Sequence, residues 1–201
     1  MADPHSLLFV KGEGYKALSR LMDYPFEGAG IMLAQNGGVD QLKALNDPVI
    51  SENLKRLGNY LKECDMEELQ TEYTRLFIYR PACPPNETAY RNDLKAHQLI
   101  ENLDACYAQA GLQLSETLSP DHISVELEFM HYLLHRQGAS PDSESNLWKE
   151  QASFFKREHL LRWVPEFCAK IHDEADKPFH HLANIMDAFV KTYADGRDQA
   201  L

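Results

Sequence analysis

The sequence has little that would place it in a membrane-spanning or secreted class. No apolar run reaches the roughly 18 residues that a membrane-spanning helix needs. Residues 7–10 are apolar, but they are too few for the core of a signal peptide, and no lysine or arginine precedes them. We therefore expect the protein to stay in the cytoplasm.

Metal-binding and catalytic patterns are also missing. The cysteines are scattered without a Cys-x-x-Cys pair, so neither a zinc site nor a disulfide framework is expected; they are Cys64, Cys83, Cys106 and Cys168. The chain has no Gly-x-x-x-x-Gly-Lys-[Ser/Thr] phosphate loop, no Gly-x-Gly-x-x-Gly and no Gly-x-Ser-x-Gly. These absences favour a binding protein without a cofactor over an enzyme.

Composition and charge indicate a globular protein with an acidic surface. Hydrophobic residues make up 44% and charged residues 25% of the 201 positions, enough for one domain over 1–201. The formal net charge is −11, from 20 basic and 31 acidic residues. This charge disfavours nucleic acid and anionic lipid as partners, and it suits a basic polypeptide segment.

Strand signals are weak and helical periodicity is strong. No sustained period-two alternation occurs, whereas apolar residues recur at helical spacing along most of the chain. We predict an all-α bundle of about eight to nine helices. The expected helices lie at about 8–22, 48–61, 65–77, 86–111, 121–137, 144–163, 166–172 and 179–193. Residues 28–38 read as a glycine-rich irregular segment, 81–85 as a rigid proline loop, 138–145 as a polar linker, and the tail from about 195 as frayed.

The helix expected over 121–137 carries the least ordinary side chains. Glu126 and His122 fall within its apolar arc, and a carboxylate that faces a core needs a specific partner. Two interpretations of Glu126 stay open: a structural ion pair or helix cap, or a polar anchor in the floor of a binding groove. Asp121 is expected to cap the helix, and His122 to line a surface beside the proline loop.

A metal site is the main alternative. Glu128, His131 and His135 share the polar arc of the same helix, and Glu128-x-x-His131 matches half of a di-iron carboxylate motif. The chain has no second Glu-x-x-His, so solvated histidines are the simpler interpretation. A helical metal-binding protein or enzyme using these three residues remains the alternative, together with a permanent small subunit of an oxidoreductase complex.

Three blocks of sequence carry a family resemblance. Residues 72–77 read Glu-Tyr-Thr-Arg-Leu-Phe and are followed by Pro-Pro-Asn-Glu-Thr-Ala-Tyr at 84–90. Residues 120–130 contain Pro-Asp-His-Ile and then Glu-Leu-Glu-Phe-Met, and residues 155–167 contain Glu-His-Leu and Trp-Val-Pro. Over roughly residues 5–195, this order resembles the TorD-like redox-enzyme maturation chaperones, which include assembly chaperones of dimethyl sulfoxide reductase and nitrate reductase.

The resemblance implies a fold, a function and a set of site residues. The chain would be a single all-helical, system-specific chaperone. It would bind the twin-arginine leader, the apoprotein, or both, of a molybdopterin oxidoreductase before export, while the cofactor is inserted. A leader has basic and apolar regions, which need an acidic rim and an apolar wall. The family's peptide-binding residues correspond here to Tyr73, Leu76, Phe77, Pro84, Pro85, Tyr90, Asp121, His122 and Glu126, with Tyr15 as a weaker candidate.

Two positions depart from the family pattern. Asn86 follows the Pro-Pro pair where relatives often carry an aromatic residue, and Thr88 stands where serine is common. The wall is therefore expected to be less apolar than in relatives. From the resemblance alone, guanine nucleotide binding and a domain-swapped dimer hinged at 138–145 also follow as expectations, although we expect a monomer and no cofactor.

Overall fold

The computed structural model describes residues 4–25, 39–115, 117–175 and 177–192, and every regular element in these ranges is helical. This confirms the all-α class. The elements are α1 (Pro4–Leu21), α3 (Asp40–Ala44), α4 (Pro48–Glu63), α5 (Met66–Tyr73), η1 (Thr74–Ile78), η2 (Glu87–Ala89), α6 (Ala96–Gln109), α7 (Ile123–Ala139), α8 (Asp142–Phe155), η3 (Lys156–Leu160), α9 (Leu161–Glu174) and α10 (Lys177–Thr192). None of the described helices is long and apolar enough to cross a bilayer.

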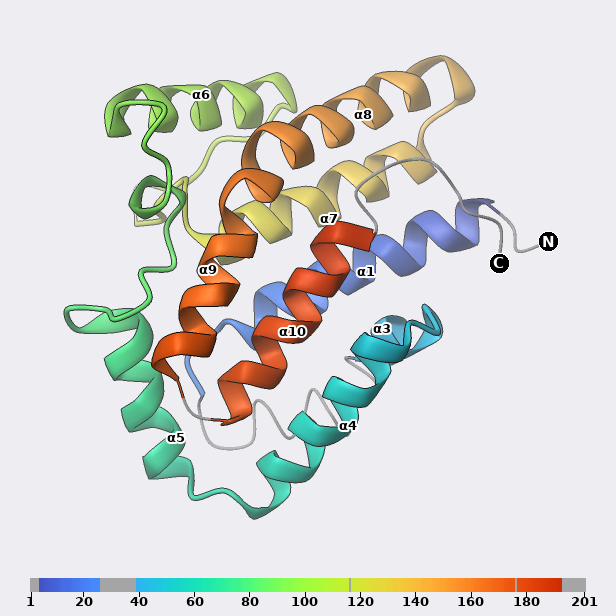
Figure 1. The fold of residues 1–201 in the computed structure, drawn as a ribbon. Coiled ribbons are helices and arrows are strands. Elements are labelled where there is room, and N and C mark those ends of the chain that lie inside the picture. The colour runs from blue at the N-terminus through green and yellow to red at the C-terminus, as the bar shows by residue number, and fades with distance from the viewer. Residues whose placement is uncertain (1–3, 26–38, 116, 176, 193–201) are drawn as a thin grey trace.

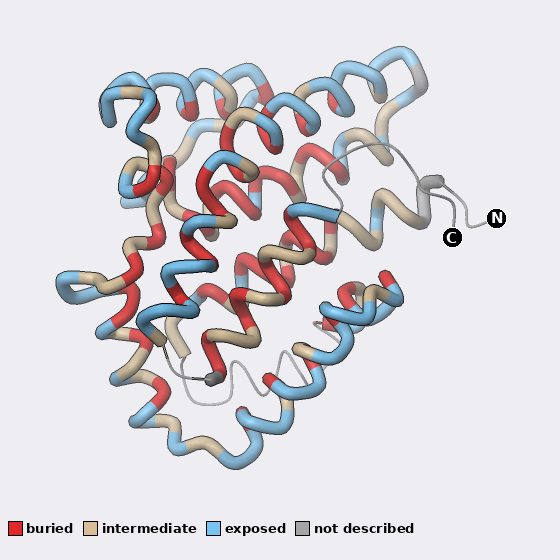
Figure 2. Tube along the Cα trace, viewed as in Figure 1, coloured by how far each residue is buried: buried red, intermediate tan, exposed pale blue. Residues whose placement is uncertain are grey.

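The helices pack in two groups, one around α7 and one around α10 (Figure 1). α7 packs on α1 and on α8, and α10 packs on α4 and on α9. Figure 2 shows that buried positions concentrate on α1, α7, α9 and α10, whereas α4, α6 and α8 turn one side to solvent. The core is therefore shared by segments that lie far apart in the sequence, because α1 and α10 occupy its centre together.

Two π-helical turns extend regular helices near this centre. Asp65 is the N-cap residue of α5, and its Oδ1 accepts hydrogen bonds from the N–H groups of Glu67 and Glu68. It runs directly into the π-helical turn η1, and α8 runs into η3 in the same way. A π-helical turn widens the helix and changes the direction of the side chains that follow, and such turns occur often at functional sites.

The prediction of one helix over residues 86–111 is wrong for the first half of that range. η2 is a single 3-10 turn, and α6 begins only at Ala96. The side chain of Arg91 accounts for the break, because its guanidinium bonds both to the Asp93 carboxylate and to the backbone carbonyl of Glu158. These contacts hold residues 91–93 in an irregular conformation. The end of the helix is close to the prediction, since Gly111 follows α6 with φ +77°.

The continuous helix expected over 144–163 is also wrong. α8 ends at Phe155, the π-helical turn η3 follows, and Pro165 lies inside α9 rather than between helices. The widened turn lies just before the stretch where Pro165 lacks a backbone N–H, so the adjustment occurs upstream of the proline. The linker predicted at 138–145 shrinks to Ser140 and Pro141. The expectations for residues 28–38 and for the tail from about 195 lie outside the described residues.

Two helical glycines give a matched test of the packing. A Cβ on Gly14 of α1 would lie 2.6 Å from the ring of Phe189, which has no solvent exposure, whereas a Cβ on Gly58 of α4 meets no atom within 4 Å. We expect Gly14→Ala to lower the free energy of unfolding by about 2 kcal/mol through overpacking. Gly58→Ala should raise it by about 0.5–1 kcal/mol through helix propensity. Chemical denaturation measures both, and equal effects at the two sites would contradict this packing of α1 on α10.

Candidate functional site

Asp121 connects residues 86–88, which follow the proline loop, to the segment before α7, and its contacts are called the Asp121 clamp below. Its carboxylate accepts hydrogen bonds from Asn86 Nδ2 (2.9 Å), Thr88 N (3.2 Å), Thr88 Oγ1 (2.6 Å) and Ser119 Oγ (2.6 Å). Burial alone would raise the pKa of Asp121, but the bonds from Ser119, Thr88 and Asn86 outweigh it, and the pKa lies below its ordinary value. The two departures from the family pattern, Asn86 and Thr88, are thus both donors to this carboxylate.

The cap of α7 differs from the sequence prediction. His122, not Asp121, is the N-cap residue, and its Nδ1 accepts a hydrogen bond from Ser124 N at 3.2 Å. Burial lowers the pKa of His122, which keeps the imidazole neutral and able to accept this bond. Asp121 binds side chains and backbone of the neighbouring loop instead. The segments also meet through an isolated antiparallel bridge between Asn86 and His122, and Ile123 N donates to the carbonyl of Pro85 at 2.9 Å.

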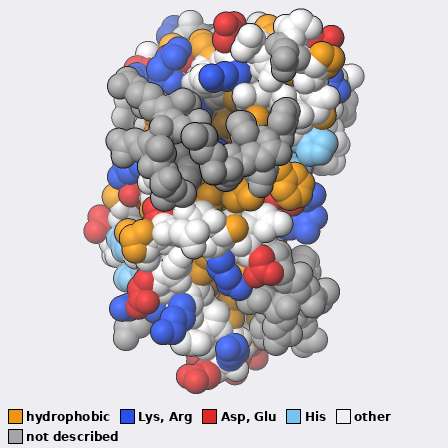
Figure 3. Space-filling view, turned by 90° about the vertical axis from the view of Figure 1, so that its right-hand side faces the viewer, with side chains coloured by type: hydrophobic (Ala, Val, Ile, Leu, Met, Phe, Trp, Pro, Cys, Tyr) orange, Lys and Arg blue, Asp and Glu red, His pale blue; other side chains and the backbone are white. Residues whose placement is uncertain are grey.

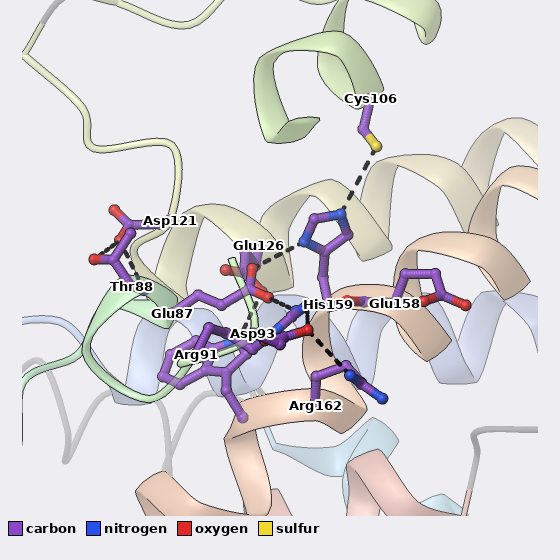
Figure 4. A network of polar contacts seen from close by, with 11 residues as sticks. Glu87, Thr88, Arg91, Asp93, Cys106, Asp121, Glu126, Glu158, His159 and Arg162 are labelled. Carbon is purple, nitrogen blue, oxygen red and sulfur yellow. Dashed lines mark hydrogen bonds and ion pairs between the residues drawn. The ribbon is translucent and has the colours of Figure 1, made fainter. Parts of the chain in front are cut away.

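A buried polar network lies next to this clamp, around Glu87 (Figure 4). Glu87 has no solvent exposure, and its Oε1 forms an ion pair with Arg91, whose side chain is 7% exposed. Its Oε2 lies 2.9 Å from His159 Nδ1 on η3. On the other side of that imidazole, Nε2 lies 4.0 Å from the thiol of Cys106 on α6. One carboxylate therefore joins η2, η3 and, through the histidine, α6.

The outer side of the network reaches solvent through Asp93. Arg91 binds Asp93 with both Nε (2.7 Å) and Nη2 (2.9 Å), and Arg162 of α9 adds a bond of 3.1 Å. The pKa of Asp93 lies well below its ordinary value, and the hydrogen bond from Arg91 is the main cause. Arg91 is therefore shared between a buried and an exposed carboxylate, in a geometry that fixes its guanidinium plane.

Glu126 is buried on α7, as its place in the apolar arc predicts. Its partner is an indole, since Trp163 Nε1 donates to Glu126 Oε2 at 3.1 Å, and Oε1 has no hydrogen-bond partner among the described residues. The structure thus gives Glu126 neither the ion pair nor the cap of the first interpretation. Burial, and then the nearby Glu87 carboxylate, raise the pKa of Glu126 well above its ordinary value. A neutral carboxylic acid is the form that suits this position.

Tyr73, Phe77 and Tyr90 meet in one aromatic cluster within the core. Tyr73 and Phe77 have ring centroids 5.0 Å apart, and Phe77 contacts Phe167 of α9 at 6.1 Å. Tyr90 contacts the same Phe167 at 5.9 Å and stacks on Trp163 at 5.6 Å. Because Trp163 also binds Glu126, the first and second family motifs are connected through α9.

Most of the ten residues that the resemblance selects lie inside the protein. Pro84 and His122 are half-buried, and the others are buried: Tyr15, Tyr73, Leu76, Phe77, Pro85, Tyr90, Asp121 and Glu126. Tyr15 lies apart from the rest, because its ring packs on Phe189 of α10 at 4.8 Å. Leader binding by these residues stays a prediction, because in this structure most of them pack inside the protein and do not face solvent.

The positions of the histidines on α7 differ from those that a shared metal ion would require. His131 Nδ1 lies 3.1 Å from the carbonyl of Gly12 and 3.6 Å from Glu13 Oε1, while Glu128 and His135 are exposed. In the part of the chain that the structure describes, no group of three or more His, Cys, Asp or Glu side chains is arranged to hold a metal ion. The described geometry gives no support to the Glu128, His131 and His135 alternative.

Sequence reasoning missed the network around Glu87. Glu87 and Arg91 are four residues apart, a spacing that often marks an ion pair, so this half could have been found. The third member, His159, lies 72 residues further along the chain, and no local pattern links it to Glu87. Cys106 had no distinguishing neighbours in the sequence.

Replacing Asp121 tests whether its carboxylate is a structural clamp. Asp121→Ala should lower the free energy of unfolding at pH 7 by about 3 kcal/mol, because several partly buried donors lose a charged acceptor. His122→Ala, which removes only the cap, should cost about 1 kcal/mol. Because the pKa of Asp121 is lowered on folding, its contribution is present above pH 3.8 and is lost as the pH falls through the folded-state pKa. Denaturation at several pH values measures this, and a pH-independent difference would contradict the clamp.

Glu126→Gln tests the buried neutral acid. Since folding raises the pKa of Glu126, the folded state holds the proton more tightly, and the stability of the natural protein falls as the pH rises from 4.5 towards the folded-state pKa. Glutamine keeps an acceptor for Trp163 and cannot ionise. The stability of the variant relative to the natural protein should therefore rise with pH across that window. A difference that stays flat between pH 4.5 and 9 would show that Glu126 is ionised in the folded state.

Comparison with known proteins identifies the family. The model of the nitrate reductase delta subunit family matches residues 44–169. The selenate reductase assembly chaperone protein of Thauera selenatis is 29% identical over 161 residues, which cover 77% of this chain and 72% of that protein. The crystal structure of a candidate redox enzyme maturation protein from Archaeoglobus fulgidus is similar with a TM-score of 0.57 and 23% identity, over 90% of this chain and 93% of that chain. The similarity confirms the fold and the TorD-like resemblance, and the chain belongs to the nitrate reductase delta subunit family.

Proposed function

We propose that the protein is a cytoplasmic assembly chaperone, not an enzyme, for the catalytic subunit of a molybdopterin oxidoreductase. It binds the twin-arginine leader of that subunit, the apoprotein, or both, and keeps the subunit from export until its cofactor is inserted. The observation that carries the proposal is membership of a family in which a 29% identical relative is a selenate reductase assembly chaperone. The net charge of −11 supports a basic segment as the bound element.

The described site supports binding better than catalysis. The carboxylates of Glu87 and Asp121 are saturated by neighbouring donors, and the Glu126 carboxyl is buried in the core. A general acid or nucleophile needs access to a substrate, and these groups are shielded from it. Their chemistry is instead suited to holding the proline loop, η3 and α7 in one fixed arrangement. A rigid arrangement lowers the entropic cost of binding a peptide.

The resemblance residues take two roles in this proposal. The buried members, such as Tyr73, Phe77 and Glu126, form the frame that holds the helices in register. Pro84 and His122 are the half-buried members, so they are the ones that a client can touch directly. Loss of a frame residue would weaken binding by lowering stability, whereas loss of His122 would change binding with little effect on helical content.

Calorimetry with a synthetic leader peptide of the client reductase tests the function. We expect saturable heat in about 50 mM salt, and at least a tenfold rise in Kd in about 500 mM salt, because the Debye length falls below the spacing of surface charges. A peptide with glutamine in place of its arginine pair is the control and should bind more weakly at low salt. Absence of heat with both the leader and the apoenzyme subunit would rule out the proposal.

A permanent subunit is the second candidate, because the matching family is described as a nitrate reductase delta subunit. Purification of the mature reductase separates the two functions. A chaperone leaves before maturation is complete, so the chain should co-purify with the apoenzyme and be absent from the finished complex. Its presence at one copy per mature enzyme would favour the subunit.

A further inference from the structure

The half-buried thiol of Cys106 lines a groove of about 680 Å³ between α6 and α8. His159 and the buried rings of Phe129 and Phe155 line the same groove. Gln151 lines it as well, and its Oε1 atom is buried without a hydrogen-bond partner among the described residues. The volume is within the range of ordinary ligand sites, and a bound molecule with a donor group would satisfy this acceptor.

Two contacts hold the imidazole of His159 beside the thiol (Figure 4). Its Nδ1 lies 2.9 Å from Glu87 Oε2, and the ring of Phe155 stacks on it with centroids 4.8 Å apart. Arg91 binds the other oxygen of Glu87, so the carboxylate is an ionised acceptor and the proton of His159 is on Nδ1. The lone pair is then on Nε2, which lies 4.0 Å from Cys106 Sγ, a long separation that such pairs often show before a substrate binds. A thiol, an imidazole and an orienting carboxylate in this order can activate a cysteine nucleophile.

The thiol of Cys106 is neutral at rest. Burial, and then the nearby Glu87 carboxylate, raise the pKa of Cys106 to about 11, so only about one molecule in ten thousand carries the thiolate at pH 7. Since the thiolate is the nucleophile in thiol chemistry, a reaction of Cys106 at neutral pH needs a base within reach, and His159 Nε2 is in that position. The half-buried thiol of Cys64 differs, because its Sγ lies 3.7 Å from the carbonyl of Leu61, a group too weakly basic to remove a proton.

The charges around the groove disfavour an anionic ligand. Arg91 lines the groove, but its guanidinium is already bound to two carboxylates. Glu158 lines it too and is paired with Arg157 at 2.7 Å, whereas Glu150 has no ion-pair partner among the described residues. The uncompensated charge at the groove is therefore negative. By contrast, acidic and basic side chains are interspersed over the face shown in Figure 3. We expect a reagent without net negative charge to enter the groove most readily.

We propose that Cys106 is a site of reversible modification, at which its sulfur forms a mixed disulfide with a small disulfide molecule of neutral or positive charge. His159 Nε2 takes the proton of the thiol as Cys106 Sγ attacks one sulfur of the small disulfide. The S–S bond of that molecule breaks, a new S–S bond to Cys106 forms, and the departing thiolate receives the proton from His159. The sulfur of Cys106 is oxidised and the departing sulfur is reduced, so the exchange needs no further oxidant.

Glu87 is a positioning residue in this step, because it orients His159 and does not touch the reacting atoms. The modification goes beyond the proposed function, since it changes the protein itself. The attached group occupies the groove between α6 and α8, and a dithiol removes it by the same exchange in reverse.

The rate of modification of the natural protein tests the assignment. The protein is treated with excess 2-hydroxyethyl disulfide at several pH values and quenched with acid, and adducts at Cys106 and Cys64 are counted by peptide mass spectrometry. At pH 7, Cys106 should react about tenfold faster than Cys64 or more. Between pH 7.5 and 9 its rate should rise less than about threefold, because the neutral imidazole is already present, whereas a route through the thiolate alone gives about thirtyfold. A rate at or below that of Cys64, or the thirtyfold rise, would overturn the assignment.

His159→Asn separates proton transfer from the contact with Glu87. Asparagine keeps a donor near the place of Nδ1 and has no basic nitrogen beside Cys106. The variant should react about tenfold more slowly at pH 7, and its rate should regain the steep rise with pH. The buried thiols of Cys83 and Cys168 report the fold, and if they become reactive the variant has unfolded and the pH dependence of the natural protein decides. A folded variant with unchanged rate and pH dependence would show that His159 is not the base.

Two further reagents of similar size test the charge of the ligand. Cystamine carries two positive charges and dithiodiglycolate two negative charges, and each rate is divided by the rate of the same reagent with N-acetylcysteine. In about 20 mM salt, cystamine should modify Cys106 about threefold faster than dithiodiglycolate or more, and the ratio should approach one in about 500 mM salt. Equal relative rates at low salt, or a faster reaction with dithiodiglycolate, would overturn the preference for a neutral or cationic disulfide.

Discussion

The buried carboxylate of Glu87 is the interaction on which the arrangement of the central segments depends. An ionised side chain without solvent exposure is costly, and the cost is offset only when every oxygen is bound. Here Arg91 takes one oxygen, His159 takes the other, and the backbone N–H of Glu87 donates to the carbonyl of Asp121 at 2.9 Å. Three segments, separated by tens of residues, are therefore positioned by the side chain and the backbone of one residue. Loss of either partner would leave a buried charge, at a cost of about 3–5 kcal/mol.

Close spacing of acidic groups has a further consequence for the core. Glu87, Asp121 and Glu126 lie near enough to influence one another, and they differ in how they are stabilised. Asp121 is surrounded by donors, Glu87 is paired with cations or potential cations, and Glu126 has a single indole donor. The pKa of Glu126, which has the single donor, is raised, whereas the pKa of Asp121, which has several donors, is lowered. Ordering the three acids in this way lets the protein keep them close together without three buried negative charges.

The sequence predicts the class of fold well, because helical periodicity is a local property. The positions of α1, α4, α7 and α10 follow from apolar spacing. The errors occur where side chains bind distant partners: Arg91 interrupts the helix expected after residue 86, and η3 replaces a continuous helix at 156–160. In the candidate site, too, local features could be predicted and long-range contacts could not. Burial of Glu126 could be predicted from its helical face, but its bond to Trp163 and the role of His159 depend on tertiary contacts that no single sequence encodes locally.

The family motif residues and the exposed side chains of α8 are under different structural constraints in this fold. Residues such as Tyr73, Phe77 and Tyr90 meet in the core, so their identity is constrained by packing and cannot be adapted to one client without loss of stability. The outer face of α8 is different, because Leu147, Glu150 and Phe154 are exposed to solvent and can change at little structural cost. The buried polar contacts of Glu87 and Asp121 therefore fix one part of the molecule, while the sequence of the neighbouring helix face is free to vary.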